Sequence, residues 1–312
     1  MGRKKKETME LRFYEVPQGE SALALLGEKW NRVYGHDEFR LHFHNLMEIG
    51  VCRKGNGKLI LDEHECVYES GMISVIPENL PHTTISDGEE PNAWEYLFFD
   101  PRGVIEELYP NNSIYQNEIA EEFSKQAYLM KFEENESICR IINGIMDELR
   151  NKNNYYQQMV HHYVCLLVYE LIRLNGRLPY YEQTKEKQTS GMQITAAMEY
   201  INKHYAMQLK AKDLADVCKM SETHFRRVFE EYVNMAPMDY LNLVRIQKAC
   251  ELMKKSNDSM DVIAVKCGFT TTSTFNRNFK KFLDTSPYQW KINPGTYERK
   301  LLNYHITALK GW

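Results

Sequence analysis

Polar and basic side chains near the C-terminus have the types and spacing that suit contact with DNA. Asn276, Arg277 and Lys280 lie within five consecutive residues, and their side chains can donate hydrogen bonds to base edges and phosphates in a DNA groove. Phe275 and Phe279 are four residues apart, which is the spacing of one buried helix face. We therefore expect a helix that buries its phenylalanines and presents the three polar side chains to DNA.

A second short helix is expected just before this one. Ile263 and Ala264 supply its apolar face, and Gly268 can adopt the left-handed backbone conformation that ends a helix. Phe269 would then point back into the core, and the threonines and serine of residues 270–274 would cap the next helix. Two short helices joined by a tight turn form a helix-turn-helix motif.

The same pattern occurs about 50 residues earlier in the chain. Leu214 corresponds to Ile263 at an offset of 49 residues, and Arg227 corresponds to Arg277 at an offset of 50. The turn of the second motif is therefore one residue longer than that of the first. An internal repeat with a single insertion in a loop predicts two helix-turn-helix motifs.

These residues resemble the AraC-type (AraC/XylS) transcription regulators, whose DNA-binding domain carries two such motifs joined by one long helix. The family signature, I-A-x-x-x-G-F followed by F-x-R-x-F-K and S/T-P, is matched by Ile263, Ala264, Gly268, Phe269, Phe275, Arg277, Phe279, Lys280, Ser286 and Pro287. The family usually has glycine three residues before each proline of the repeat. Here Asn234 and Asp284 stand there, and both residue types tolerate a left-handed backbone. The resemblance covers residues 192–295 and implies binding to double-stranded promoter or operator DNA.

The resemblance also implies which side chains contact DNA. They are Thr223, His224, Arg226 and Arg227 on a first recognition helix over 222–233, and Thr272, Ser273, Asn276 and Arg277 on the second, with Lys280 and Lys281 as phosphate partners. Some of the arginines could instead contact phosphate alone, or pair with Glu230 and Glu231. A helix over 238–254, started by Pro237, would space the two recognition helices about one DNA turn apart.

The distribution of charge agrees with a DNA-binding C-terminal part. The formal net charge of −4 would by itself argue against a nucleic-acid partner. Residues 192–300, however, carry 17 Lys and Arg against 12 Asp and Glu, whereas the remainder carries 22 against 31. A basic C-terminal part on an acidic body is expected of a DNA-binding domain joined to a separate sensing domain.

Length and cysteine content narrow the class of protein. At 312 residues the chain predicts two domains. It has no run of 18 apolar residues, and no apolar stretch follows its basic first residues, so neither a membrane span nor a secretory signal is expected. Its seven cysteines form no Cys-x-x-Cys pair, which predicts reduced, mostly buried thiols in a cytoplasmic protein.

The N-terminal part is expected to be β structure. Residues 1–10 are a charged arm that we expect to be disordered, and residues 11–110 contain short alternating runs broken by Gly, Asn, Asp and Pro. In Phe39–His44 strict alternation places Arg40, His42 and His44 on one strand face. Further strands are expected at residues 58–61, 71–77 and 92–100. Many short antiparallel strands predict a small barrel or jelly roll.

This part resembles the cupin fold. The first cupin motif, His-x-His, three or four residues, Glu, six residues, Gly, is matched by His42, His44, Glu48 and Gly55. The second motif, Gly-x5-Pro-x-Gly-x2-His, is matched by Gly71, Pro77 and His82, with Asn79 in place of the middle glycine. In metal-binding cupins the positions of His42, His44, Glu48 and His82 hold the metal, and three imidazoles and a carboxylate suit a divalent transition ion. The alternatives are that these side chains bind an organic effector without metal, or that they are structural.

Many AraC-type proteins use such a barrel to sense a small molecule, and a sugar is the expected effector. Aromatic faces and hydrogen-bonding side chains are the usual lining of a sugar site. The candidate effector contacts are Trp30, Arg40, His42, His44, Glu48, Tyr68, His82, Trp94 and Tyr96. Taken singly, each of Trp30, Arg40, Tyr68, Trp94 and Tyr96 favours core packing over a ligand contact.

Residues 111–175 are expected to be helical. Apolar residues at 119, 123, 127 and 130 predict one helix, those from 138 to 149 a second, and residues 155–174 a third. One apolar face must pack on the barrel, and by resemblance this region is the dimer interface, although an ordinary helical cover is the alternative. The polar residues 176–191 are the expected linker, and residues 296–312 a C-terminal tail.

The expected fold is therefore an α+β two-domain chain: a cupin-like β-barrel with a helical extension, then an all-α double helix-turn-helix domain. The leading hypothesis is an effector-controlled transcription regulator, an activator and homodimer that works with RNA polymerase, needs no cofactor, and is not an enzyme. A metal-dependent cupin enzyme fused to a DNA-binding domain is the alternative. A protein-interaction module that has lost DNA binding is a third, against which Arg227 and Arg277 argue.

Overall fold

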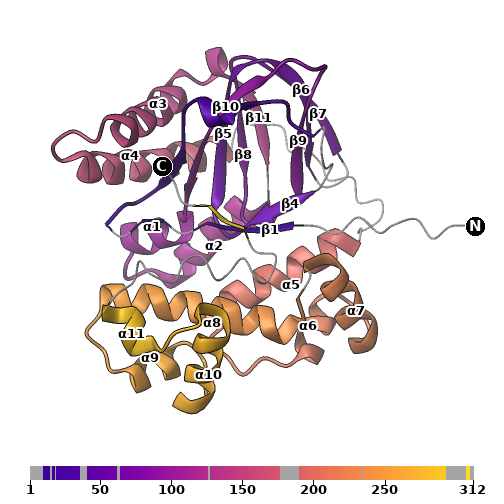
Figure 1. Ribbon diagram of the computed structural model, residues 1–312, viewed down its shortest axis with the longest axis vertical. Helices are drawn as coiled ribbons and strands as arrows, with labels where there is room; N and C mark the ends of the chain where they lie inside the picture. The colour runs from indigo at the N-terminus through magenta and orange to yellow at the C-terminus, as the bar shows by residue number, and fades with distance from the viewer. Residues whose placement is uncertain are drawn as a thin grey trace, which may run out of the picture. The chain divides into compact units, whose positions relative to one another are not determined.

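The computed structural model describes residues 10–14, 16–17, 19–35, 41–61, 64–125, 127–175, 190–233, 235–292 and 307–309. The chain divides into two compact units, one made mainly of residues 12–186 and the other mainly of residues 187–308 (Figure 1). The expected N-terminal arm up to residue 9, Arg40, Asn234, linker residues 176–189 and most of the expected tail lie outside the described residues.

Two antiparallel sheets form the β part of the first unit. One sheet contains, in spatial order, β1 (Glu10–Tyr14), β4 (His42–His44), β9 (His82–Ser86), β6 (Asn56–Leu61) and β7 (His64–Glu69). The other contains β11 (Tyr128–Lys131), β8 (Met72–Ile76), β5 (Met47–Lys54), β10 (Asn92–Phe99) and β2 (Leu23–Leu25). The two-residue strand β3 (Asn31–Arg32) also pairs with β10 and follows a 3-10 turn at Glu28–Trp30.

Alternation along the central strands separates two apolar clusters. On β10, Tyr96 and Phe98 pack between the sheets, whereas Leu97 and Phe99 pack against the helices outside the second sheet. On β5, Ile49 follows the same rule and faces the helices. Because successive residues of a strand point to opposite faces, each of these strands contributes side chains to both clusters. Glu48, the residue before Ile49, therefore points between the sheets.

Four helices cover the outer face of the second sheet. They are α1 (Pro101–Leu108), α2 (Ser113–Lys125), α3 (Glu136–Asn151) and α4 (Tyr156–Asn175). The expectation that a single helix continues through residues 127 and 130 is wrong. Tyr128–Lys131 is instead β11, which pairs with Met72–Val75 of β8 and is followed by a 3-10 turn at Phe132–Glu134.

The second unit is helical and contains two helix-turn-helix motifs joined by α8, as expected. Its helices are α5 (Ser190–His204), α6 (Ala211–Val217), α7 (Glu222–Val233), α8 (Pro237–Lys255), α9 (Met260–Lys266), α10 (Thr272–Leu283) and α11 (Pro287–Ile292). A short strand, β12 (Thr307–Leu309), is described near the C-terminus.

The residues expected to start and end helices are confirmed in this unit. Thr271 caps α10 by accepting a hydrogen bond from the backbone N–H of Thr274 at 3.1 Å, and Pro237 occupies the first turn of α8. Gly268 has a φ of +84°, and a Cβ there would lie 2.7 Å from the carbonyl oxygen of Tyr205. Asp284, which replaces a family glycine, has a φ of +52°.

The hydropathy of the helices and the state of the cysteines were also expected from the sequence. None of the helices among the described residues combines the length and the hydropathy that a membrane span requires. All seven cysteines are free thiols, and Cys52, Cys139, Cys218 and Cys267 are buried.

Candidate functional site

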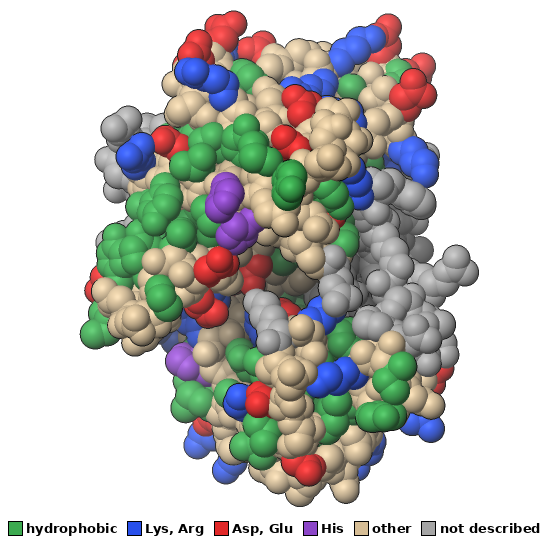
Figure 2. All heavy atoms as spheres, turned by 90° about the vertical axis from the view of Figure 1, so that its left-hand side faces the viewer, with side chains coloured by type: hydrophobic (Ala, Val, Ile, Leu, Met, Phe, Trp, Pro, Cys, Tyr) green, Lys and Arg blue, Asp and Glu red, His purple; other side chains and the backbone are tan. Residues whose placement is uncertain are grey.

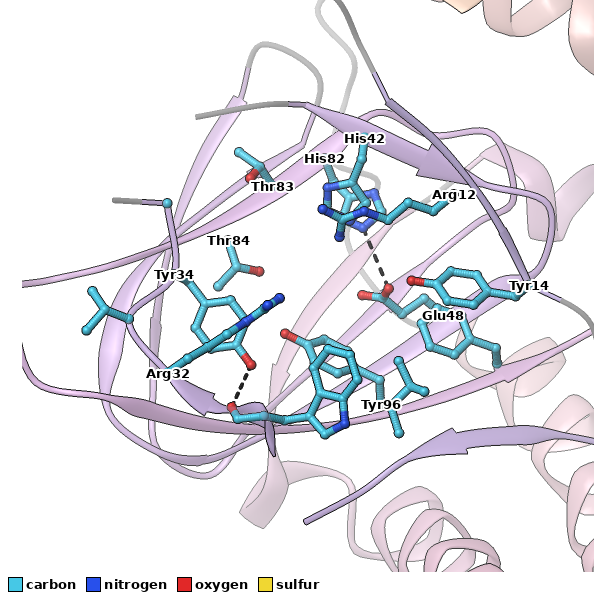
Figure 3. A pocket seen from close by; sticks show the side chains of 15 residues that line it. Arg12, Tyr14, Arg32, Tyr34, His42, Glu48, His82, Thr83, Thr84 and Tyr96 are labelled. Atoms are coloured by element: carbon cyan, nitrogen blue, oxygen red, sulfur yellow. Dashed lines mark hydrogen bonds and ion pairs between the residues drawn. The ribbon is translucent and has the colours of Figure 1, made fainter. Parts of the chain in front are cut away.

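A cavity of about 430 Å³ lies between the two sheets of the first unit (Figure 3). Residues from both sheets and from the turn before β3 line it: Arg12, Tyr14, Leu25, Trp30, Arg32, Val33, Tyr34, Gly35, His42, Glu48, His82, Thr83, Thr84, Tyr96 and Phe98. Its wall is therefore mixed, with aromatic rings on one part and charged or imidazole groups on another.

Strand register brings the polar groups of the cavity together. His42 on β4 and His82 on β9 are directly opposed partners in neighbouring strands, so their rings lie 4.2 Å apart between centroids. Glu48 comes from the other sheet, where alternation along β5 turns it inward. His44 lies two residues after His42, and its ring centroid is 4.8 Å from that of His82.

The Glu48 carboxylate is surrounded by imidazoles. Its Oε2 atom lies 3.2 Å from Nε2 of His44 and 3.7 Å from Nε2 of His82. Glu48, His44 and His82 are all buried. Burial alone would raise the pKa of the Glu48 carboxyl, but His82 and His44 lower it well below its usual range, so the carboxylate is ionised at neutral pH.

Backbone contacts fix the tautomers of two of these histidines. Nδ1 of His44 lies 2.7 Å from the carbonyl oxygen of Leu46, and Nδ1 of His82 lies 2.9 Å from that of Leu80. A carbonyl oxygen can only accept a hydrogen bond, so each Nδ1 must be the protonated nitrogen. In a neutral ring the Nε2 lone pair then faces the Glu48 carboxylate. Burial favours the neutral form of His44, because it lowers the pKa of this imidazole.

The donor set fits a divalent transition cation. His42, Glu48 and His82 can each offer one ligand atom, and these atoms all lie within 4.8 Å of one another. Nε2 of His44 and Nε2 of His82 are buried and have no hydrogen-bond partner among the described residues. An imidazole that donates its other N–H to a backbone carbonyl is also the usual form of a metal-ligating histidine.

The other part of the cavity is aromatic and carries a guanidinium. The hydroxyl of Tyr34 donates a hydrogen bond of 2.7 Å to the carbonyl oxygen of Trp30, and the two rings of Trp30 and Tyr96 meet edge to face at 5.8 Å. Burial raises the pKa of Tyr34 and of Tyr96, so both hydroxyls remain protonated at neutral pH. Arg32 lies with its guanidinium carbon 5.3 Å from the Trp30 ring centroid and 4.8 Å from that of Tyr34.

The structure brings some of the expected effector residues to the cavity and not others. Trp30, His42, Glu48, His82 and Tyr96 line it. His44 does not reach the cavity but lies behind Glu48. Arg40 lies outside the described residues.

Two expected effector contacts belong to the packed core instead. Tyr68 and Trp94 are fully buried and meet edge to face, with ring centroids 4.9 Å apart. The Tyr68 hydroxyl accepts a hydrogen bond from the side chain of Asn92 and donates one to the backbone carbonyl of Ile85. Neither residue lines the cavity, because both rings and the hydroxyl are already used in packing between the sheets.

Sequence reasoning missed seven cavity residues with polar or aromatic side chains: Arg12, Tyr14, Arg32, Tyr34, Thr83, Thr84 and Phe98. A signal for two of them was present, because Trp30, Arg32 and Tyr34 alternate along the chain, as the residues of one strand face do. Thr83 and Thr84 are consecutive on β9, where the pattern alone does not separate inward from outward positions.

The expected DNA contacts of the first motif lie on the exposed side of α7. Phe225 and Phe229 are buried on the opposite side of this helix. The four expected contacts, Thr223, His224, Arg226 and Arg227, are all exposed. Both arginines form ion pairs within the helix: Arg226 with Glu222 and Arg227 with Glu231, each with an N–O distance of 2.8 Å. Arg227 thus pairs with the acid expected from the sequence, whereas Arg226 pairs with Glu222 rather than with Glu230.

The expected contacts of the second motif lie on α10. Ser273, Asn276, Arg277, Lys280 and Lys281 are exposed and Thr272 is half-buried, while the phenylalanines of this helix are buried. Lys281 pairs with Asp239 at 2.6 Å. No ion pair joins Arg277 to another residue in the part of the chain that the structure describes.

Two family models match the chain, one on each unit. The model described as an AraC-like ligand binding domain matches residues 33–159, and the model described as a helix-turn-helix domain matches residues 214–292.

Relatives match over most of this chain and most of their own length. The chain is 21% identical to the raffinose operon transcriptional regulatory protein RafR of Pediococcus pentosaceus, over 79% of this chain and 85% of that protein. It is 22% identical to the HTH-type transcriptional activator RhaS of Pectobacterium carotovorum subsp. carotovorum (strain PC1), over 80% of this chain and 86% of that protein. A solved structure of the DNA-binding domain of AdpA in complex with a target DNA has 25% identity and a TM-score of 0.31, over 33% of this chain and 96% of that chain. The two family models and these relatives together show that this chain belongs to the AraC family of transcription regulators, with a ligand-binding domain followed by a DNA-binding helix-turn-helix domain.

Proposed function

We propose that this regulator binds a carbohydrate effector in the cavity of its first unit and that the bound effector changes how it acts on promoter DNA. The observation that carries the proposal is the cavity itself, which lies in the unit that matches the AraC-like ligand binding model. Its volume of about 430 Å³ falls within the usual range for a small-molecule site.

The lining of the cavity supports a carbohydrate. The indole of Trp30 offers an apolar face for a sugar ring, while Tyr34, Tyr96 and Thr84 offer hydroxyls for hydrogen bonds to sugar hydroxyls. The relative RafR carries a raffinose operon in its name, which points to the same class of effector for a chain of similar domain order.

We further propose that the DNA-bound form is a homodimer. Met159, Leu166 and Tyr169 are 40%, 51% and 37% exposed on α4, and their spacing of seven and three residues places them on one helix face. Ile114 and Tyr115 of α2 are also exposed, and Figure 2 shows hydrophobic side chains gathered on the face that carries the helical cover. An exposed apolar area of this kind is typical of an association surface.

The sign of regulation that we propose is activation, exerted together with RNA polymerase. The name of the relative RhaS describes a transcriptional activator, and the exposed arginines and lysines of α7 and α10 would hold the protein on a promoter.

The test is an assay in which effector and DNA are varied separately. DNA fragments that bind the full chain would first be selected from the genome of its source. Gel shifts and a reporter would then be measured with and without each member of a saccharide panel, and a binder at about 100 times its dissociation constant should add about 2.7 kcal/mol to the stability of the unit that holds it. His82→Ala should lose the response to the saccharide but keep DNA binding. If no saccharide alters stability or DNA binding, the carbohydrate proposal is wrong; if no genomic DNA is retained, the regulator proposal is wrong as well.

A second candidate function is a metal-dependent enzyme fused to a DNA-binding domain. The observation that favours it is the donor set of His42, Glu48 and His82. A bound cation would supply Lewis acidity toward an oxygen of a ligand in the cavity. The names of the relatives describe transcription regulators, so we place this candidate second. Turnover of an organic acid or sugar that depends on added metal would reverse this order.

A further inference from the structure

Arg32 is a cation of the cavity wall that pairs with no carboxylate among the residues that the structure describes. Figure 3 shows its guanidinium directed between Tyr34 and Tyr96. Its contacts are with the rings of Trp30 and Tyr34, at 5.3 and 4.8 Å from their centroids. No ion pair joins Arg32 to an acid within the described ranges of the chain. Arg32 is exposed on β3, and the two rings contact its guanidinium without using its N–H donors as an acid would, so these donors remain available to a ligand.

The other charges of the cavity do not balance Arg32. Glu48 is the one carboxylate among the lining residues, and it lies beside His44 and His82. Arg12 is the second guanidinium of the lining, and Figure 3 shows it beside His42 and His82. Among the described lining residues, the cavity therefore has a histidine–carboxylate part and an aromatic part that carries the positive charge of Arg32.

We propose that the effector is an anionic carbohydrate, a hydroxylated ring that bears a carboxylate or a phosphate, and that Arg32 binds the anionic group. This inference rests on the proposed carbohydrate effector and narrows its class. Trp30 would pack against the ring, and Arg32 would donate two parallel hydrogen bonds to two oxygens of the anion.

Desolvation is the reason why a neutral sugar fits less well. A ligand that fills the aromatic part displaces the water that solvates Arg32. A neutral hydroxyl replaces few of the hydrogen bonds that Arg32 makes with this water. Covering N–H donors of the guanidinium without pairing them costs binding free energy. Two anionic oxygens pair with both the charge and the parallel N–H donors of the guanidinium. Binding of the anion is therefore more favourable than binding of the neutral sugar.

The test uses matched ligands on the full chain. Glucose is compared with glucuronate and glucose 6-phosphate, and galactose with galacturonate and galactose 6-phosphate, by thermal shift and by calorimetric titration. Arg32→Gln removes the charge, and Arg32→Lys keeps the charge but loses the fork of donors. Arg140→Gln is the control, because Arg140 is an exposed arginine of α3 that pairs with Glu136 and lies outside the cavity lining.

We expect at least one anionic member of these sets to bind roughly 10- to 100-fold more tightly than its neutral partner, and Arg32→Gln to remove that difference. The preference of Arg32→Lys for the anionic ligand should lie between that of the unmodified chain and that of Arg32→Gln. The preference of Arg140→Gln should match that of the unmodified chain. A carboxylate that binds without its phosphate counterpart, or the reverse, identifies the anionic group. The inference is overturned if a neutral sugar binds as tightly as its acid and phosphate, or if Arg32→Gln leaves the preference intact; in both cases the carbohydrate proposal stands. Absence of binding by every saccharide would overturn both proposals together.

Discussion

Arg227 and Glu231 lie one turn apart on α7 and form an ion pair with an N–O distance of 2.8 Å. The corresponding pair in the repeat is Arg277 and Lys281, so the equivalent arginine of α10 has a basic neighbour where α7 has an acidic one. The sequence of α7 contains three acidic and two basic residues, and that of α10 contains three basic residues and no acidic one. The second helices of the two motifs, α7 and α10, therefore differ in charge.

The first prediction is that the second motif depends more strongly on its arginine than the first. Arg277→Ala should weaken binding to a selected operator by about 1–3 kcal/mol, because Arg277 needs to break no ion pair before it meets a base or a phosphate. Arg227→Ala should cost less, since Glu231 already offsets part of its charge. Fluorescence anisotropy with the operator and with a scrambled duplex measures both effects.

The control for this comparison is the dependence of affinity on salt. Lys280→Ala should weaken binding to both duplexes alike and reduce the slope of log affinity against log salt by about one. If Arg277→Ala left operator affinity unchanged while Arg227→Ala lowered it, the proposed asymmetry of the two motifs would be wrong.

The second prediction concerns Arg245, which links the two motifs from the middle of α8. Its side chain is buried and donates hydrogen bonds of 2.8 Å to the carbonyl oxygens of Tyr205 and Met207, while its guanidinium lies 5.6 Å from the ring centroid of Phe269. Arg245→Met would leave both carbonyls without this donor. We expect the helical unit to lose about 2–4 kcal/mol of unfolding free energy, measured by urea unfolding and circular dichroism.

A matched substitution on the same helix separates the role of Arg245 from a general loss of charge. Lys248 is partly exposed, with 28% of its side chain accessible, and pairs with Glu251, so Lys248→Met should change stability by less than about 0.5 kcal/mol. Equal effects of the two substitutions would contradict the linking role of Arg245.

The helix-turn-helix motifs could be predicted almost completely from the sequence, because the relevant interactions are local. Gly268 and Thr271 lie within four residues of the turn that they shape, and a cap or a left-handed residue acts on its own neighbours. The same holds for Pro237 at the start of α8.

The cavity was predicted less completely, because strand faces and partners depend on distant residues. Met130 belongs to an apolar pattern with helical spacing, yet it lies on β11, where it pairs with Ile73 of β8, 57 residues earlier in the chain. Trp94 and Tyr96 both face inward on β10, but Trp94 packs on Tyr68 while Tyr96 reaches the cavity. The opposing sheet, and not the strand's own sequence, decides whether an inward-facing residue lines the cavity or packs in the core.

The third prediction concerns thiol reactivity. Burial raises the pKa of Cys52 and of Cys267 to about 12, and that of Cys139 and of Cys218 to about 11. At pH 8 almost none of each thiol is therefore ionised, and only the thiolate reacts with iodoacetamide. We expect these four cysteines to stay unmodified in the native protein at pH 8, and to react once it is unfolded. Peptide mass spectrometry measures each site.

The half-buried Cys66 of β7 is the internal reference for that experiment. It should be alkylated before the four buried cysteines under native conditions. Modification of Cys267 at the same rate as Cys66 would contradict its burial in the second helix-turn-helix motif.

The fourth prediction is that the exposed face of α4 forms a homodimer. Leu166→Glu places a charge in the centre of the row that also contains Met159 and Tyr169, and burying that charge against a second copy would be unfavourable. We expect a dimer for the unmodified chain and a monomer for the variant in size-exclusion chromatography with light scattering. Val67→Glu is the control, because Val67 is 71% exposed on β7, away from α4. A monomeric unmodified chain, or a dimeric Leu166→Glu variant, would contradict this interface.

The last prediction is that the histidine–carboxylate cluster binds a divalent transition cation. His42, Glu48 and His82 can each offer one ligand atom, all within 4.8 Å of one another, and a divalent cation among them would be attracted by the ionised Glu48 carboxylate. Ni²⁺ or Zn²⁺ should therefore raise the Tm of the chelator-treated protein, and a metal titration should show one site. Glu48→Gln removes the negative charge at nearly constant volume and should abolish this rise. Glu65→Gln, an exposed acid of β7 that pairs with Lys58, should not. A chelator-treated protein whose Tm is unchanged by added metal would show that the cluster does not hold a divalent cation.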